Sequence, residues 1–125
     1  MGDQLSTAEQ LAELEAALLE MDQVSVERGG SPQAWNRLTD RTQSLQLVLR
    51  ETPEGRAGIT ALVGHGSATV RLAAAAYALF WDEPVARAEL ERQMNGPGLG
   101  SINAKYTLLE FDRGTLSMSW RPRGT

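Results

Sequence analysis

Hydrophobic residues recur at helical spacing along most of the chain, and start and stop signals separate the segments. In the first segment the apolar residues fall on one stripe, formed by Leu11, Leu14, Leu18 and Met21. Ser6 and Glu9 have the spacing of a capping box, and Gly29-Gly30 follows as a break. The pattern predicts an amphipathic helix that buries one face.

Two further helix starts are marked by a capping residue followed by proline, at Ser31-Pro32 and Thr52-Pro53. The helix after Pro32 is expected to bury Trp35, Leu38, Leu45, Val48 and Leu49, with Thr42 in the same stripe. The helix after Pro53 is shorter and ends near Val63. We expect Ile59, Leu62 and Val63 to face inward.

The segment that begins at Ser67 has almost no polar face. One stripe contains Val70, Ala73, Ala74, Tyr77, Phe80 and Trp81, and another contains Leu72, Ala76 and Leu79. Only Arg71, with Ala75 and Ala78 beside it, offers a route to water. Such a helix needs neighbours on more than one side, and its alanines allow them to approach closely.

A fifth helix is predicted from Asp82-Glu83-Pro84, with Ala86, Leu90 and Met94 inward. Ser101 is expected to cap a sixth helix that ends at Gly114 and carries Ile102, Tyr106, Leu109 and Phe111. Five aromatic residues are predicted to lie in the core: Trp35, Tyr77, Phe80, Tyr106 and Phe111. The tail is expected to be extended.

These elements predict an all-α fold of about six helices in stacked antiparallel pairs. We expect a single helical domain over residues 1–125, with residues 1–5 and 119–125 flexible. An irregular bundle and a regular stack both fit the pattern.

One part of the pattern resembles a known family. The segment from Ser67 to Leu116 is similar to a small bacterial family of HEAT-like domains of uncharacterised function. The matching features are Val70-Arg71-Leu72-Ala73-Ala74-Ala75, Asp82-Glu83-Pro84, the glycine-rich link at 96–100, and residues 104–110 with Asp112-Arg113-Gly114. The resemblance implies a HEAT-like α-solenoid fragment with a protein-binding surface and no catalytic residues. No fixed repeat is readable from Leu11 to Val63.

Composition narrows the possible partners. The 125 residues contain no cysteine, and the formal net charge is −4. Seven acids precede the first basic residue, Arg28, whereas arginines close the chain. Nucleic-acid binding requires a basic footprint, so no nucleic-acid partner is expected, and an acidic surface favours a basic protein. No apolar run is long enough to span a membrane, which predicts a cytoplasmic protein without a membrane partner. Arginine-rich, alanine-rich composition is typical of a bacterial source.

The sequence contains few residues in patterns that indicate a catalytic site. His65 is the only histidine, and the glycines beside it indicate a turn. The link Gly96-x-Gly98-x-Gly100 lacks the lysine of a phosphate-binding loop. The carboxylate pairs Glu13/Glu20 and Glu89/Glu91 are expected to lie on solvated helix faces. We therefore predict no catalytic, metal or cofactor site.

The remaining hypothesis is a non-enzymatic protein-interaction module of bacterial type, such as an immunity or adaptor protein that binds a basic partner. The candidate interaction residues are Glu13, Glu20, Trp81 and Trp120. The alternative is a ligand-binding or hydrolytic helical domain with a pocket near His65, in which Ser67 or the glycine-rich link takes part. The pattern leaves the oligomeric state open, including a homo-oligomeric subunit.

Overall fold

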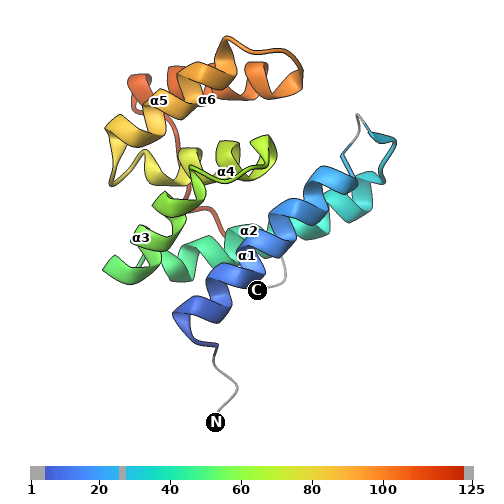
Figure 1. The fold of residues 1–125 in the computed structure, drawn as a ribbon, viewed down its shortest axis with the longest axis vertical. Coiled ribbons are helices and arrows are strands. Elements are labelled where there is room, and N and C mark those ends of the chain that lie inside the picture. The colour runs from blue at the N-terminus through green and yellow to red at the C-terminus, as the bar shows by residue number, and fades with distance from the viewer. Residues whose placement is uncertain (1–4, 26–27, 123–125) are drawn as a thin grey trace. The chain divides into compact units, whose positions relative to one another are not determined.

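Helices are the only regular secondary structure in the part of the chain that the structure describes. This computed structural model describes residues 5–25 and 28–122, apart from the side chain of Leu99. The helices are α1 (Thr7–Gln23), α2 (Pro32–Leu49), α3 (Pro53–Leu62), α4 (Ala68–Ala78), α5 (Glu83–Met94) and α6 (Leu99–Arg113) (Figure 1). Residues 115–122 have no regular secondary structure. The predicted all-α class with an extended tail is confirmed.

The chain divides into two compact units. Unit 1 contains Met1–Gly58 and Ser119–Thr125, and unit 2 contains Ile59–Met118. The boundary lies within α3. The expectation of one domain stays a prediction, as does the flexibility of the termini. Residues 1–4 and 123–125 lie outside the described residues.

The capping signals fix most of the helix starts. The Ser6 hydroxyl accepts a hydrogen bond from the backbone N–H of Glu9, and the Glu9 carboxylate accepts one from the backbone N–H of Ser6. This capping box holds the pKa of Glu9 below its ordinary value. Ser31 and Ser67 cap α2 and α4 with the hydroxyl alone, which accepts a hydrogen bond from the backbone N–H of Ala34 and of Val70, respectively.

The predicted start of the sixth helix, with Ser101 as its cap, was wrong by three residues. The helix begins at Leu99, directly after Gly98, whose φ of 88° is readily adopted only by glycine. Ser101 therefore lies inside the first turn, where its hydroxyl donates to the Gly98 carbonyl at 2.8 Å. Gly114 ends the helix in the left-handed conformation, as predicted.

In unit 1, α1 packs against α2. The buried residues include Leu14, Leu18, Leu45 and Leu49, together with Thr42 as predicted. Val48 was expected in the core but is 51% exposed, whereas Gln43 and Gln46 are buried. The buried face of α2 therefore includes the side-chain amides of Gln43 and Gln46 in place of Val48.

In unit 2, α4 packs against α5 and also contacts α6, which packs on α5. The buried residues of α4 include Ala75 and Ala78, which are both 0% exposed. The prediction that α4 reaches water past these two alanines was therefore wrong. Of the three residues on that route, only Arg71 stays partly exposed. The small side chains let neighbouring residues cover nearly the whole C-terminal half of α4.

The predicted aromatic core is only partly correct. Tyr77 is buried, and Trp35 and Phe111 are half-buried. Phe80 and Tyr106 are 41% and 55% exposed, because α6 turns Ala104 and Leu108 inward and Phe80 lies beyond the end of α4. The Phe80 ring meets Phe111 edge to face, with centroids 5.6 Å apart.

Gly55 occupies a position in α3 that tolerates no side chain. A Cβ atom added there would lie 1.9 Å from the Leu49 carbonyl oxygen, which is backbone and cannot rotate away. We expect Gly55→Ala to lower the free energy of unfolding by about 1–3 kcal/mol. Gly64→Ala is the control, because its nearest neighbour would be 3.7 Å away. Guanidinium unfolding followed by circular dichroism measures both, and equal stability of the two variants would contradict the prediction.

Candidate functional site

A chain of side-chain hydrogen bonds fixes the C-terminal strap, which we define as residues 119–122. The Gln43 amide nitrogen donates to the Trp120 carbonyl at 2.7 Å. The Gln46 amide donates to the Gln43 side-chain oxygen at 3.1 Å, and Arg50 donates to the Gln46 side-chain oxygen at 3.4 Å. Gln43 and Gln46 are 3% and 0% exposed. Buried amides require partners, so this chain sets where the strap lies on α2.

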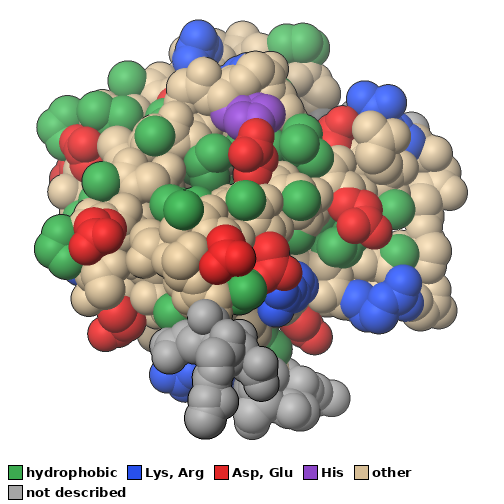
Figure 2. All heavy atoms as spheres, turned by 60° about the horizontal axis from the view of Figure 1, so that its bottom comes forward, with side chains coloured by type: hydrophobic (Ala, Val, Ile, Leu, Met, Phe, Trp, Pro, Cys, Tyr) green, Lys and Arg blue, Asp and Glu red, His purple; other side chains and the backbone are tan. Residues whose placement is uncertain are grey.

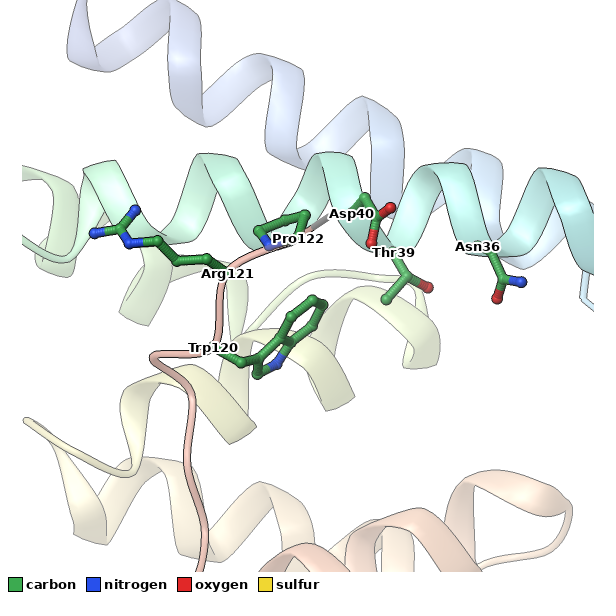
Figure 3. Close-up of a pocket in the computed structure, with 6 residues that line it drawn as sticks. All are labelled: Asn36, Thr39, Asp40, Trp120, Arg121 and Pro122. Atoms are coloured by element: carbon green, nitrogen blue, oxygen red, sulfur yellow. The ribbon is translucent and has the colours of Figure 1, made fainter. Parts of the chain in front are cut away.

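The strap and α2 together form an open pocket of about 400 Å³, the Trp120 pocket (Figure 3). It is lined by Asn36, Thr39, Asp40, Trp120, Arg121 and Pro122. Asn36 and Asp40 are one helical turn apart, with Thr39 between them. The Trp120 side chain is 43% exposed, whereas Pro122 is buried. The pocket thus combines an accessible indole with the polar face of a helix.

Three residues of α2 bring hydrogen-bond acceptors to this pocket. Asp40 offers a carboxylate and Asn36 an amide oxygen, and the Thr39 hydroxyl keeps its lone pairs because it donates its proton to the Trp35 carbonyl. In the described part of the chain Asp40 has no ion-pair partner. Arg121 extends away from the indole in Figure 3. These surroundings suit a ligand that is a cation and a hydrogen-bond donor.

The four predicted interaction residues are divided between the two units. Trp120 lines the pocket, but the other three do not. Glu13 pairs with Arg41 of α2, and Glu20 is exposed on α1. Trp81 belongs to unit 2, where it is half-buried and its indole N–H donates to the Thr60 hydroxyl at 2.9 Å.

The acids of α1 are engaged within unit 1 to a large extent. Besides Glu13, Asp22 pairs with Arg28, and Glu9 accepts a hydrogen bond from the backbone of the N-cap residue Ser6. The predicted acids Asp3 and Glu27 lie outside the described residues. On the face shown in Figure 2, acidic side chains lie singly or in pairs among hydrophobic and neutral ones. The acidic side chains visible on that face do not form one continuous patch.

A buried carboxylate that the sequence did not reveal lies in unit 2. Glu89 is 3% exposed, so its predicted place on a solvated face was wrong. Its carboxylate accepts hydrogen bonds from Arg71 at 3.0 Å, from Gln93 at 2.8 Å and from Arg92. It also lines an open pocket of about 430 Å³ between α3 and α5. Burial by itself raises the pKa of Glu89, but the three hydrogen bonds outweigh it and hold the pKa below its ordinary value.

This cluster joins secondary-structure elements. Arg71 also donates to the carbonyls of His65 and Gly66, and Gln93 donates to the Ala68 carbonyl. Glu89 therefore links α5 to the start of α4 and to the turn before it. Both carboxylate oxygens are used in these contacts, which favours a structural role over acid–base chemistry.

The geometry at His65 does not favour a hydrolytic site. The backbone N–H of Ser67 donates to His65 Nδ1 at 2.9 Å. That nitrogen is an acceptor for a main-chain donor and is not placed to remove the proton of the Ser67 hydroxyl. The hydroxyl itself accepts from the backbone N–H of Val70 at the start of α4. The pair thus shapes the turn before α4.

Other kinds of site receive no support in the described residues. No group of three or more potential metal-ligating side chains occurs among them. None of the helices in this part of the chain combines the length and the apolarity needed to cross a membrane. Comparison with protein-family models, with curated proteins and with solved structures finds no match for the chain.

Replacing Gln43 tests how the strap is held. Gln43→Leu removes the donor to the Trp120 carbonyl and leaves Gln46 without its acceptor. We expect unfolding free energy to fall by about 1–3 kcal/mol and residues 119–122 to gain fast motion in ¹⁵N relaxation. Gln23→Leu makes the same change at an exposed position of α1. Unchanged relaxation of the strap in Gln43→Leu would show that other contacts hold it.

The Glu89 cluster predicts a specific response to acid. Because the folded pKa is lowered, the stabilisation is complete above the ordinary value of 4.5 and is lost as the pH falls through the folded pKa. Glu89→Gln should lower unfolding free energy at pH 7 by about 1–3 kcal/mol and lose part of this acid dependence. Glu91→Gln, at an exposed position on the same helix, is the control. Urea unfolding across pH 3–7 measures both, and equal acid dependence in Glu89→Gln and the wild type would contradict the prediction.

Proposed function

We propose that the protein is a non-enzymatic protein-interaction module that binds a basic segment of a partner through the Trp120 pocket. The observation that carries this proposal is the juxtaposition of an exposed indole and a carboxylate without an ion-pair partner among the described residues, Trp120 and Asp40. A cation over an indole ring is attracted by the ring's electrons. Asp40 adds a charge of the opposite sign on the same pocket.

Arginine fits this pocket better than lysine does. A guanidinium has several donors in one plane, and the pocket supplies acceptors on Asn36, Thr39 and Asp40. It also stacks on an aromatic face, while its apolar stem packs along the same ring. The buried amides of α2 preorganise the strap, so less conformational entropy is lost when a side chain is bound.

Binding of a basic segment agrees with the net negative charge of the chain. In this proposal the segment is bound at one pocket and not along the whole acidic N-terminal part. An immunity protein that covers a basic toxin or nuclease domain, and an adaptor that holds a basic tail, are two forms of such a module. Tryptophan and arginine contribute strongly to binding free energy across protein interfaces. The HEAT-like resemblance of residues 67–116 supports a binding role and is independent of the pocket.

Short peptides provide a direct test. We expect acetylated Gly-Arg-Gly-Arg-Gly to shift the Trp120 indole N–H signal in ¹H–¹⁵N spectra in a saturable way. The lysine analogue should bind more weakly and the glutamate analogue should not bind. Trp120→Ala and Asp40→Asn should each weaken arginine-peptide binding by about 5–10-fold.

Glu20→Gln is the matched control for Asp40→Asn, because each change removes one negative charge from unit 1. If both variants weaken binding equally, general charge attraction rather than the pocket is responsible. Absence of a saturable shift with the arginine peptide would overturn the proposed function. A pull-down at low and moderate salt, with Asp40→Asn beside the wild type, extends the test to the natural partner.

A further inference from the structure

The outer face of α6 carries large hydrophobic side chains that the fold leaves exposed. Ile102, Tyr106 and Leu109 are 51%, 55% and 37% exposed. Their spacing of four and three residues places them on one stripe of the helix, which we name the α6 stripe. Ala104 and Leu108 are buried on the opposite face. α6 is therefore apolar on both sides, although unit 2 covers only one.

Such a stripe differs from isolated exposed hydrophobic residues, which are ordinary on protein surfaces. A helix at the end of a stack is normally polar on its outer face, because nothing packs there. Three large side chains in one row instead match the contact row of a helix pair. The α6 stripe has the form of a surface that receives another helix.

The charges on either side of the stripe indicate which helix that is. At 100° per residue, Lys105 and Asp112 fall on one flank, and Asn103 and Glu110 fall on the other. When two copies of α6 pack antiparallel about a two-fold axis perpendicular to the helices, each flank lies next to the same flank of the second copy. Lys105 then faces Asp112 of the second copy, and Asn103 faces Glu110 of the second copy.

A parallel pair has the opposite consequence. Its two-fold axis runs parallel to the helices, so each flank lies next to the other flank of the second copy. Asp112 then comes near Glu110 of the second copy. These like charges repel. Arg87 donates two hydrogen bonds to Asp112 and lowers its pKa, so this carboxylate stays ionised, although the pairing with Arg87 reduces both its attraction to Lys105 and its repulsion of Glu110. Only the antiparallel arrangement therefore avoids placing Asp112 near Glu110 of the second copy.

We propose that the α6 stripe is the interface of a homodimer in which two copies of α6 pack antiparallel. The interface is isologous, as in most protein dimers, and its axis passes near Tyr106 and Leu109. One helical stripe buries less than the roughly 800 Å² per partner of a standard interface. The dimer is accordingly weak, with dissociation in the range of about 10–100 µM.

Sedimentation velocity across about 5–500 µM tests the proposal, since this range brackets the expected dissociation constant. We expect reversible dimers in the wild type and monomers in Ile102→Glu. Val48→Glu is the matched control, because Val48 is also β-branched and 51% exposed but lies on α2 of unit 1. A monomer at every concentration overturns the proposal, and so does an Ile102→Glu variant that still forms dimers.

Single cysteines report the orientation, because the natural chain has none. With a short bismaleimide, Leu109→Cys should cross-link into dimers, since residue 109 lies near the axis. Arg113→Cys should not, because its copies lie about 11 residues or roughly 16 Å apart along an antiparallel pair. Efficient cross-linking of both variants indicates a parallel pair and overturns the antiparallel assignment. The outcome is independent of peptide binding at the Trp120 pocket, which belongs to unit 1.

Discussion

The hydrogen bond from Gln43 to the Trp120 carbonyl is the interaction on which the candidate site depends. It joins a buried side chain of α2 to a segment with no regular secondary structure, 77 residues later in the chain. Gln46 donates to the side-chain oxygen of Gln43, and Arg50 donates to that of Gln46, so the buried amides have hydrogen-bond partners. This chain of donors and acceptors ties the backbone of Trp120 to the helix that carries Asp40.

Helix positions could be predicted from the sequence because they are set locally. Ser6, Ser31 and Ser67 cap helices as their neighbours indicated, and Gly114 ends α6. The inward face was predictable where a helix has one apolar side, as in α1. It was not predictable in α6, which is apolar on two sides. Which side is covered depends on α5, and local periodicity carries no information about that choice.

The candidate site could be predicted only in part. Trp120 was a candidate from the sequence because aromatic side chains contribute strongly to binding free energy at interfaces. Asp40, Asn36 and Thr39 could not be associated with it, because the distance in sequence is about 80 residues and no motif marks the pair. Gln43 and Glu89 were missed for a related reason. Each is a polar residue with a partner outside its own helix, Trp120 for Gln43 and Arg71 for Glu89, and periodicity counts such polar residues as exposed.

The ion pairs change how the acidic composition should be interpreted, because paired carboxylates are less able to bind a partner. Net charge describes long-range attraction, which steers a basic partner but does not select a site. Pairing with Arg41 and Arg28 reduces what Glu13 and Asp22 can offer a partner, although they contribute to the count of acids. Asp40 contributes the same single charge, yet it lies beside an exposed aromatic ring and a row of acceptors. Specific recognition therefore follows from what surrounds a carboxylate, and the helix with the most acids need not be the surface that binds.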